Sequence, residues 1–244
     1  MPTILITGAS SGLGAEMARQ FAALGYDLAL CARRTDRLED LAASLPGVKV
    51  SVKALDVNDH DAVFRVFEEF RAEFGTLEKI IVNAGLGKGQ PLGTGRFDAN
   101  LATAQTNFIG ALAQTEAAAK IFREQDAGQL VMISSMSAVR GMPRNITTYA
   151  ATKAAVAHLA EGFRADVMHT PIKVTVLYPG YIVSEMSATS ATTPLVSSTE
   201  KGVRAMVSAI EKEKASARVP SWPWVPVGFA LEHLPLPLAR KFMG

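Results

Sequence analysis

The chain has 244 residues, 48% of them hydrophobic, which is enough for one large α/β domain with a substantial buried core. Its 25 basic and 23 acidic side chains nearly cancel, so no strong basic field favours a nucleic-acid partner. The single cysteine, Cys31, rules out an internal disulfide, and neither a signal-peptide core nor a run of about 18 apolar residues is present, so we expect a cytoplasmic protein.

Short apolar runs alternate along the chain with longer stretches of helical period. The runs, each predicted to be a strand, are residues 3–6, 28–31, 50–54, 79–82, 130–133 and 174–177. The predicted helices are residues 13–24, 37–45, 59–74, 97–122, 149–168 and 199–213. Continuous apolar strands separated by helices predict an α/β fold: one doubly wound parallel sheet of the Rossmann type, spanning residues 1–244 as a single domain.

A glycine-rich turn joins the first predicted strand to the first predicted helix. Gly8 permits a tight turn, and Gly12 and Gly14 permit close approach of the backbone to a pyrophosphate and of the helix to the sheet. The helix N-terminus adds free N–H groups and a positive dipole end, which suit an anion. An ordinary turn is the alternative, but the position predicts a phosphate cradle made of Gly8, Ser10, Ser11, Gly12, Leu13 and Gly14.

The cradle reads T-G-x-x-x-G-x-G, which differs from the usual G-x-G-x-x-G and resembles the short-chain dehydrogenase/reductase family. Further motifs of that family follow in order, and together they cover residues 3 to about 184. They are N-A-G (Asn83, Ala84, Gly85), N-x-x-G from Asn107, the serine strand at residues 133–135, Y-x-x-x-K from Tyr149 to Lys153, and P-G (Pro179, Gly180). The resemblance implies a nicotinamide-dependent oxidoreductase.

The end of the second predicted strand indicates which nicotinamide cofactor is used. An NAD site needs a carboxylate there, whereas this chain has Ala32 followed by Arg33 and Arg34. A guanidinium can bind a 2′-phosphate by paired, charge-assisted hydrogen bonds. We therefore predict NADP(H), with Arg33 as the preferred phosphate ligand and NAD(H) as the less favoured cofactor; two solvated arginines are the alternative. By resemblance, Asp56 and Val57 border the adenine.

Tyr149 and Lys153 are the predicted acid–base pair. Hydride transfer to a carbonyl creates an alkoxide that must gain a proton. The two residues lie four apart on a predicted helix, so they project from one face, and the ammonium group is expected to lower the tyrosine pKa from about 10. By resemblance, Lys153 also holds the nicotinamide ribose. An alanine-rich helix with one surface lysine is the alternative.

Ser135 is predicted to polarise the substrate oxygen. The family usually places this serine thirteen residues before the tyrosine, an offset that falls here on Met136. Counting back from residues 141–143 selects Ser135 instead, and Ser134 and Ser137 are the alternatives.

Two further segments complete the site by resemblance. Asn107 is expected to anchor a water that relays protons from Lys153 to solvent, although a mid-helix asparagine can simply bond its own backbone. The turn after the sixth strand is expected to lie against the nicotinamide, with the Ile182 backbone and the Ser184 hydroxyl near the carboxamide. The family normally has threonine where Ser184 stands.

We expect no metal site and no nucleophile elbow. The four histidines show no ligand spacing, and one cysteine cannot supply a structural zinc site. No G-x-S-x-G motif is present.

Residues 185–198 are rich in serine, threonine and alanine and are predicted to form a mobile lid over the site. Met142, Tyr181 and Met186 are predicted to form an apolar, adaptable wall. Because few charges are available to fix an anion, the expected small-molecule substrate is a lipophilic ketone, aldehyde or secondary alcohol.

The tail, residues 219–244, is rich in proline, tryptophan and leucine. Its prolines are predicted to prevent any long regular helix. The favoured role is packing over the pocket or onto a partner subunit, and contact with a membrane surface is the less favoured alternative. From the family we expect a homodimer or homotetramer, formed through the alanine-rich helices at 97–122 and 149–168.

Two other functions compete with the enzyme. A cofactor-binding sensor without turnover would need only the cradle, so the presence of all four predicted catalytic residues disfavours it. An epimerase or dehydratase is disfavoured because such relatives usually carry T-G-x-x-G-x-x-G and a larger substrate domain.

Overall fold

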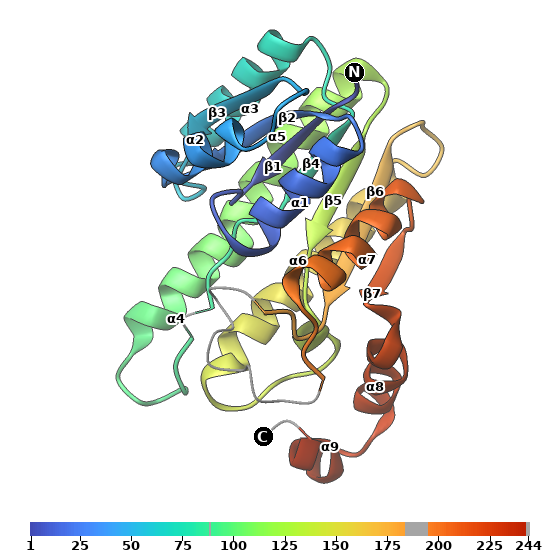
Figure 1. Ribbon diagram of the computed structural model, residues 1–244. Helices are drawn as coiled ribbons and strands as arrows, with labels where there is room; N and C mark the ends of the chain where they lie inside the picture. The colour runs from blue at the N-terminus through green and yellow to red at the C-terminus, as the bar shows by residue number, and fades with distance from the viewer. Residues whose placement is uncertain (88, 184–194, 243–244) are drawn as a thin grey trace.

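A seven-stranded, wholly parallel sheet forms the centre of the computed structural model, which describes residues 1–87, 89–183 and 195–242 (Figure 1). The strand order is β3-β2-β1-β4-β5-β6-β7. The strands are β1 (Thr3–Thr7), β2 (Asp27–Ala32), β3 (Val50–Ala54), β4 (Lys79–Val82), β5 (Gln129–Ile133), β6 (Lys173–Pro179) and β7 (Ser216–Val219). The predicted doubly wound Rossmann-type sheet is confirmed. The order reverses between β1 and β4, so the topological switch point lies beyond their carboxyl ends.

Helices cover both faces of the sheet. One face packs against α1 (Gly12–Ala23), α2 (Thr35–Ala43) and α7 (Thr199–Glu211). The other packs against α3 (His60–Phe74), α5 (Gly110–Gln125) and α6 (Thr147–Asp166). Because both faces are covered, the central strands are buried along their length, which explains why β1 and β5 read as continuous apolar runs.

The helix predicted over residues 97–122 is not continuous. It consists of α4 (Phe97–Ala104), a π-helical turn η1 (Gln105–Ile109) and α5. A π turn holds one more residue than an α turn, so it changes the direction in which the side chains project, and such turns are frequent at functional sites. Asn107, the predicted site residue of this segment, lies in the π turn.

The C-terminal part of the chain contains elements that the sequence did not predict. After β7 come α8 (Ser221–His233) and α9 (Leu236–Phe242), which lie beyond the carboxyl end of β7 (Figure 1). The prolines, which were predicted to prevent any long regular helix, still allow these two separate helices. The α8 segment is interrupted at Trp222, and Pro223 and Pro226 stand at the start of the regular part, where few backbone N–H groups have helical partners.

In the described ranges, no helix is both long enough and apolar enough to cross a membrane. The same residues contain no group of three His, Cys, Asp or Glu side chains arranged to hold a metal ion.

Candidate active site

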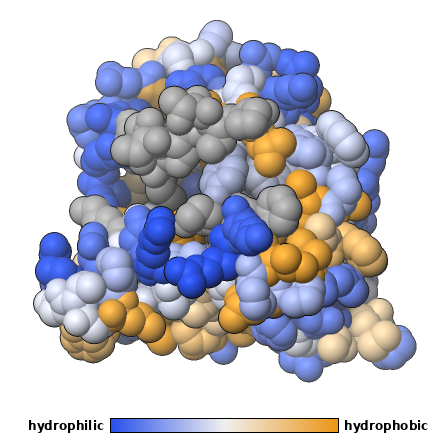
Figure 2. All heavy atoms as spheres, turned by 90° about the horizontal axis from the view of Figure 1, so that it is seen from below, coloured by the Kyte–Doolittle hydropathy of each residue, from blue (hydrophilic) through white to orange (hydrophobic). Residues whose placement is uncertain are grey.

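A cavity of about 720 Å³ lies at the carboxyl ends of the strands. Its walls come from the segments that follow β1 to β6, together with Tyr149 and Lys153 of α6 and the inner face of α8. Figure 2 views the molecule from this end, where hydrophilic and hydrophobic side chains lie side by side. Most of the predicted site residues therefore meet at one place, which is the place that an open parallel sheet offers a ligand.

The predicted phosphate cradle is held to the loop after β4. The Thr7 hydroxyl accepts hydrogen bonds from the backbone N–H groups of Asn83 (3.0 Å) and Ala84 (3.1 Å). In return, Asn83 Nδ2 donates to the Thr7 carbonyl at 2.9 Å. A Cβ atom at Gly14 would lie 2.5 Å from the Gly8 carbonyl oxygen and 2.7 Å from Asn83 Nδ2. The cradle therefore requires glycine at 14, although Gly14 itself does not line the cavity.

Two arginines border the other end of the cavity, and the structure distinguishes them. Arg34 lies across the cradle, and its Nη2 donates to Ser11 Oγ at 2.7 Å and to Ser10 Oγ at 3.3 Å. Arg33 also lines the cavity and is exposed. Arg33 was the preferred phosphate ligand from the sequence, whereas the contact of Arg34 with the cradle serines is seen only in the structure.

The predicted adenine-bordering residues Asp56 and Val57 line the cavity beside these arginines. Asn58, which the sequence analysis did not single out, lines it too. Its Nδ2 donates to Asp56 Oδ1 at 3.1 Å and to Thr106 Oγ1 at 3.1 Å, which ties the end of β3 to the π turn η1.

The three serines near the end of β5 have different surroundings. Ser134 is buried, and its hydroxyl donates to the Lys153 carbonyl at 2.7 Å, so it anchors α6. Ser135 caps the short helix η2 (Met136–Val139) and lies close enough to Tyr149 for its side chain to lower the pKa of the phenol. Ser137 donates to Ser135 Oγ from its backbone N–H (3.1 Å) and its hydroxyl (3.0 Å). Among the three, Ser135 is the one placed beside the tyrosine.

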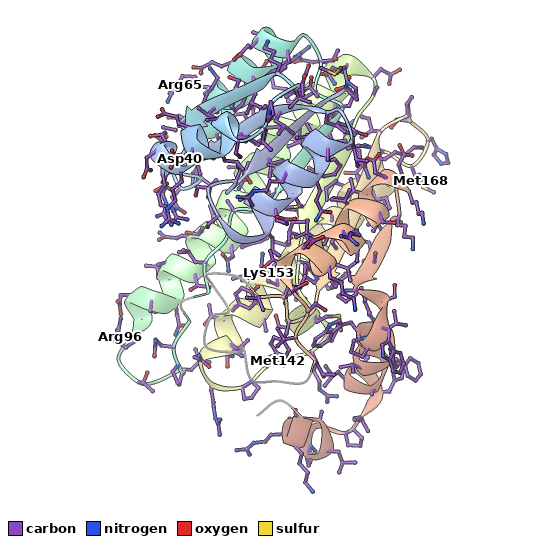
Figure 3. The ribbon with its side chains drawn as sticks, viewed as in Figure 1. Asp40, Arg65, Arg96, Met142, Lys153 and Met168 are labelled. Atoms are coloured by element: carbon purple, nitrogen blue, oxygen red, sulfur yellow. The ribbon has the colours of Figure 1, made fainter. Side chains whose placement is uncertain are left out.

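Lys153 lies behind Tyr149, with its Nζ 5.8 Å from the centroid of the tyrosine ring. The side chain is 6% exposed, and Nζ donates to the Ile133 carbonyl at 2.8 Å. Figure 3 shows Lys153 and Met142 in the lower half of the molecule, whereas Arg65 lies at the opposite end. The i, i+4 spacing thus brings the phenol and the amine to one side of α6, as the sequence predicts.

The pKa of Tyr149 differs from the sequence-based expectation, and that of Lys153 is also shifted. Burial raises the pKa of Tyr149, and the hydrogen bond with Ser135 opposes this only in part. Burial also lowers the pKa of Lys153 to about 8. The expected lowering of the tyrosine pKa by the ammonium is therefore wrong, because desolvation disfavours both charged forms. Tyr149 is a protonated phenol at neutral pH, which is the form that donates a proton.

Replacing Lys153 by methionine should stabilise the fold near neutral pH. The pKa of Lys153 is lower in the folded protein than the ordinary 10.5, so its charged form destabilises the fold fully below about pH 8. That cost disappears as the pH rises towards 10.5. We expect Lys153→Met to raise the free energy of unfolding at pH 7 by about 1–3 kcal/mol, partly offset by the lost bond to Ile133, with the gain shrinking above pH 8.

Urea denaturation of both proteins between pH 6 and 10.5 measures this effect. Lys79→Met is the matched control, because the Lys79 ammonium is also buried but lies 3.6 Å from Glu211 and donates to Gln129. That variant should lose stability. A Lys153→Met protein that is less stable than wild type throughout this pH range would contradict the assignment of an uncompensated buried charge.

Asn107 holds the loop after β4 rather than presenting a free amide. It is 1% exposed; its Oδ1 accepts from the Leu86 N–H at 2.6 Å, and its Nδ2 donates to the Leu86 carbonyl at 2.8 Å. Nδ2 also reaches Thr152 Oγ1 at 3.4 Å. Both N–H groups of the side chain are thus engaged, and its part in a water relay stays a prediction.

The turn after β6 lines the cavity through Pro179, Gly180 and Ile182. Gly180 has a specific reason to be glycine, because a Cβ atom there would overlap the indole ring of Trp224. Trp224 also packs edge-to-face on Tyr181, with ring centroids 5.4 Å apart. The predicted Ser184, and Met186 of the predicted wall, lie outside the described residues, as does most of the predicted lid at 185–198.

The inner face of α8 supplies lining residues that the sequence analysis did not identify: Trp224, Val227, Ala230, Leu231 and Leu234. Their apolar character was visible in the tail, and packing over the pocket was the favoured role. No local pattern could assign individual side chains to the cavity, because the prolines obscured the helical period.

Comparison with known proteins gives concordant findings. The family model described as short chain dehydrogenase matches residues 2–195. An uncharacterized oxidoreductase of Mycobacterium tuberculosis is 53% identical over 243 residues, covering 98% of this chain and 96% of that protein. A short-chain dehydrogenase from Sphingobium yanoikuyae, solved in complex with NADPH, has a TM-score of 0.83 at 28% identity and covers 95% of this chain and 92% of its own.

A second solved structure shares the fold. A short chain dehydrogenase/reductase from Burkholderia phymatum, solved in complex with NAD, has a TM-score of 0.86 at 20% identity, covering 98% of this chain and 95% of its own.

Proposed function

Because this chain belongs to the short-chain dehydrogenase family, we propose that it is an NADPH-dependent oxidoreductase that moves a hydride between the nicotinamide and a carbonyl or secondary alcohol. The observation that carries the proposal is the meeting of Tyr149, Ser135 and Lys153 at the cavity, beside a glycine cradle at the switch point of the sheet. A sensor would need only the cradle.

The cradle fits a dinucleotide, since it leaves no space for a Cβ atom at Gly14 and directs the N-terminus of α1 at the cavity. The cofactor would lie along Gly8, Ser10, Ser11, Gly12 and Leu13, and then along Asn83, Ala84, Gly85, Pro179, Gly180 and Ile182. When bound, it would supply the hydride. Lys153 would hold the nicotinamide ribose hydroxyls.

The chain's own residues would handle the proton. Ser135 would donate a hydrogen bond to the substrate oxygen and stabilise the charge that develops there. Tyr149, which is protonated at neutral pH, would give its proton to the same oxygen. Lys153 would stabilise the tyrosinate that results. Asn107 would support this site by holding the loop at Leu86.

A preference for NADPH is supported by the end of β2. No acid stands there to repel a 2′-phosphate, and Arg33 and Arg34 both line the cavity. The Sphingobium yanoikuyae relative was solved with NADPH, whereas the Burkholderia phymatum structure was solved with NAD.

Removing either arginine should weaken NADPH binding much more than NADH binding. A charge-assisted hydrogen bond to phosphate contributes about 1.5–3 kcal/mol, so we expect Arg33→Ala and Arg34→Ala each to raise the Kd for NADPH about 10- to 100-fold. The Kd for NADH should change less than about threefold. Fluorescence titration with both cofactors measures the difference. Arg65→Ala on α3 is the control and should change neither Kd; equal weakening of both cofactors would contradict the assignment.

The cavity supports an uncharged, lipophilic substrate. Among its described lining residues, the charged ones are Arg33, Arg34, Asp56 and Lys153, all of which are assigned above to the cofactor or to catalysis. The wall that the tail and residues 142–146 supply is mostly apolar: it includes Met142, Ile146, Trp224, Leu231 and Leu234, beside the uncharged Asn145. A carboxylate placed there would lose its hydration without gaining a partner.

A panel of carbonyl compounds tests the function. We expect NADPH consumption, followed at 340 nm, with uncharged aryl and alkyl ketones or aldehydes. A ketone of similar size that carries a carboxylate should react at least about 10-fold more slowly, because a buried unpaired charge is costly. Tight NADPH binding without consumption by any member of the panel would favour the sensor.

We also propose that the protein is a cytoplasmic homodimer or homotetramer. The segments predicted to assemble carry exposed apolar side chains, among them Phe97 and Leu101 on α4 and Ile109 in η1. Sedimentation analysis would determine the state.

A further inference from the structure

Helix α8, which lines the part of the cavity proposed to bind the substrate, is hydrogen-bonded to the segment that follows Ser135. Arg140 follows η2, the short helix capped by Ser135. Its Nη1 donates to the Leu231 carbonyl at 2.7 Å and also to the Leu234 carbonyl. These carbonyls lie at the C-terminal end of α8, where a cation both satisfies unpaired oxygens and faces the negative end of the helix dipole.

A second contact joins the same two elements. A Cβ atom at Gly228 would lie 2.8 Å from Met136 Cε, so the residue next to Ser135 packs directly against the middle of α8. Met136 is 4% exposed and also lines the cavity. The segment 136–140 therefore contacts the second half of α8, by van der Waals packing at Gly228 and by the Arg140 guanidinium at Leu231 and Leu234.

The position of this segment determines where the Ser135 hydroxyl lies. Ser137 donates two hydrogen bonds to Ser135 Oγ, and the Ala138 N–H donates to the Ser135 carbonyl at 2.9 Å. A continuous set of contacts thus runs from the Leu231 and Leu234 carbonyls through Arg140 and η2 to Ser135, whose side chain lies close enough to Tyr149 to affect the pKa of the phenol.

We propose that Arg140 is a positioning residue that couples the α8 wall to Ser135, so that a substrate bound against Leu231 and Leu234 fixes the serine relative to Tyr149. The inference rests on the proposed function for its catalytic consequence. Arg140 does not line the cavity, and so acts through η2 and not by touching the substrate. Displacements of about 1 Å in a site can lower rates by about 100-fold, so this coupling is large enough to measure.

The structure offers a matched control, because α8 has a second arginine anchor that bypasses the serine. Arg218 of β7 forms an ion pair with Glu232 and donates to the Val225 carbonyl at 3.3 Å. It holds α8 to the edge of the sheet and, within the described residues, makes no hydrogen bond to η2, although its guanidinium approaches α8 at Gly228, where Met136 also packs. Removal of the Arg218 side chain should increase the mobility of α8 alone. Removal of the Arg140 side chain should increase the mobility of both α8 and the segment that contains Ser135.

The experiment compares Arg140→Met and Arg218→Met, with Arg140→Lys as the conservative variant. With a bulky uncharged ketone, we expect Arg140→Met to lower kcat about 10-fold or more and to raise the deuterium isotope effect with 4-deuterated NADPH. Arg218→Met should mainly raise KM. The Kd for NADPH should change less than about twofold in all variants, and Arg140→Lys should recover most of kcat, since its ammonium can still donate to the carbonyls.

Amide hydrogen exchange provides a readout that does not depend on turnover. Arg140→Met should speed exchange in peptides covering residues 133–142 as well as in α8, whereas Arg218→Met should speed it in α8 only. Arg140→Lys gives the same comparison if the methionine variant does not fold. Unchanged protection of residues 133–142 in both Arg140 variants, or the same kcat and KM pattern for Arg140→Met and Arg218→Met, would overturn the proposal. Absence of turnover in the wild type would instead contradict the proposed function, and the exchange result would still decide the coupling.

Discussion

Replacing Tyr149 by phenylalanine should lower kcat by about 1,000-fold or more while leaving the affinity for NADPH nearly unchanged. The substitution removes one oxygen atom and keeps the aromatic ring beside Lys153. The site then has Ser135 to polarise the substrate oxygen but no phenol to supply the proton. Lys153 cannot take over, because its Nζ donates to the Ile133 carbonyl and lies behind the ring.

The measurement is NADPH consumption at saturating substrate, paired with fluorescence titration of NADPH. Tyr181→Phe is the matched control. Tyr181 also lines the cavity, but it is 46% exposed and packs on Trp224, so loss of its hydroxyl should change kcat less than about threefold. A Tyr149→Phe enzyme that keeps more than about a tenth of the wild-type kcat would exclude the tyrosine as the proton donor.

Replacing Gly14 by alanine should abolish useful cofactor binding, with an increase of about 100-fold or more in the Kd for NADPH. The new methyl group would lie 2.5 Å from the Gly8 carbonyl oxygen and 2.7 Å from Asn83 Nδ2. Both neighbours are fixed: Gly8 belongs to the cradle, and Asn83 is bonded to Thr7. Helix α1 must therefore move away from the sheet, and its N-terminus no longer faces the cavity.

Gly162→Ala separates this steric effect from a general effect of removing a glycine. Gly162 lies within α6, and nothing stands within 4 Å of the position of its Cβ. Alanine there should leave NADPH binding unchanged and stabilise the fold by up to about 1 kcal/mol, since glycine is a poor helix former. Far-ultraviolet circular dichroism shows whether Gly14→Ala keeps its fold. A folded Gly14→Ala protein with wild-type affinity would mean that the cradle is not where the dinucleotide binds.

Local patterns of the sequence determined the sheet and the position of the site. Strands β1, β2, β4 and β5 are the apolar runs that a doubly covered parallel sheet requires, and each could be recognised within a window of a few residues. The cradle and the N-A-G segment each follow the end of a strand, and Tyr149 and Lys153 lie on one face of a helix. Topology alone therefore placed them at the same edge of the sheet.

Only the tertiary structure decided which of several similar residues face the cavity and what surrounds them. It distinguished Ser135 from the buried Ser134, showed Arg34 hydrogen-bonded to the cradle serines, and placed the inner face of α8 on the wall of the same cavity. Each outcome depends on residues distant in the chain, as in the bonds between Arg140 and the end of α8. The protonation of Tyr149 and Lys153 likewise follows from burial, which is set by the packing of the whole domain and not by their spacing.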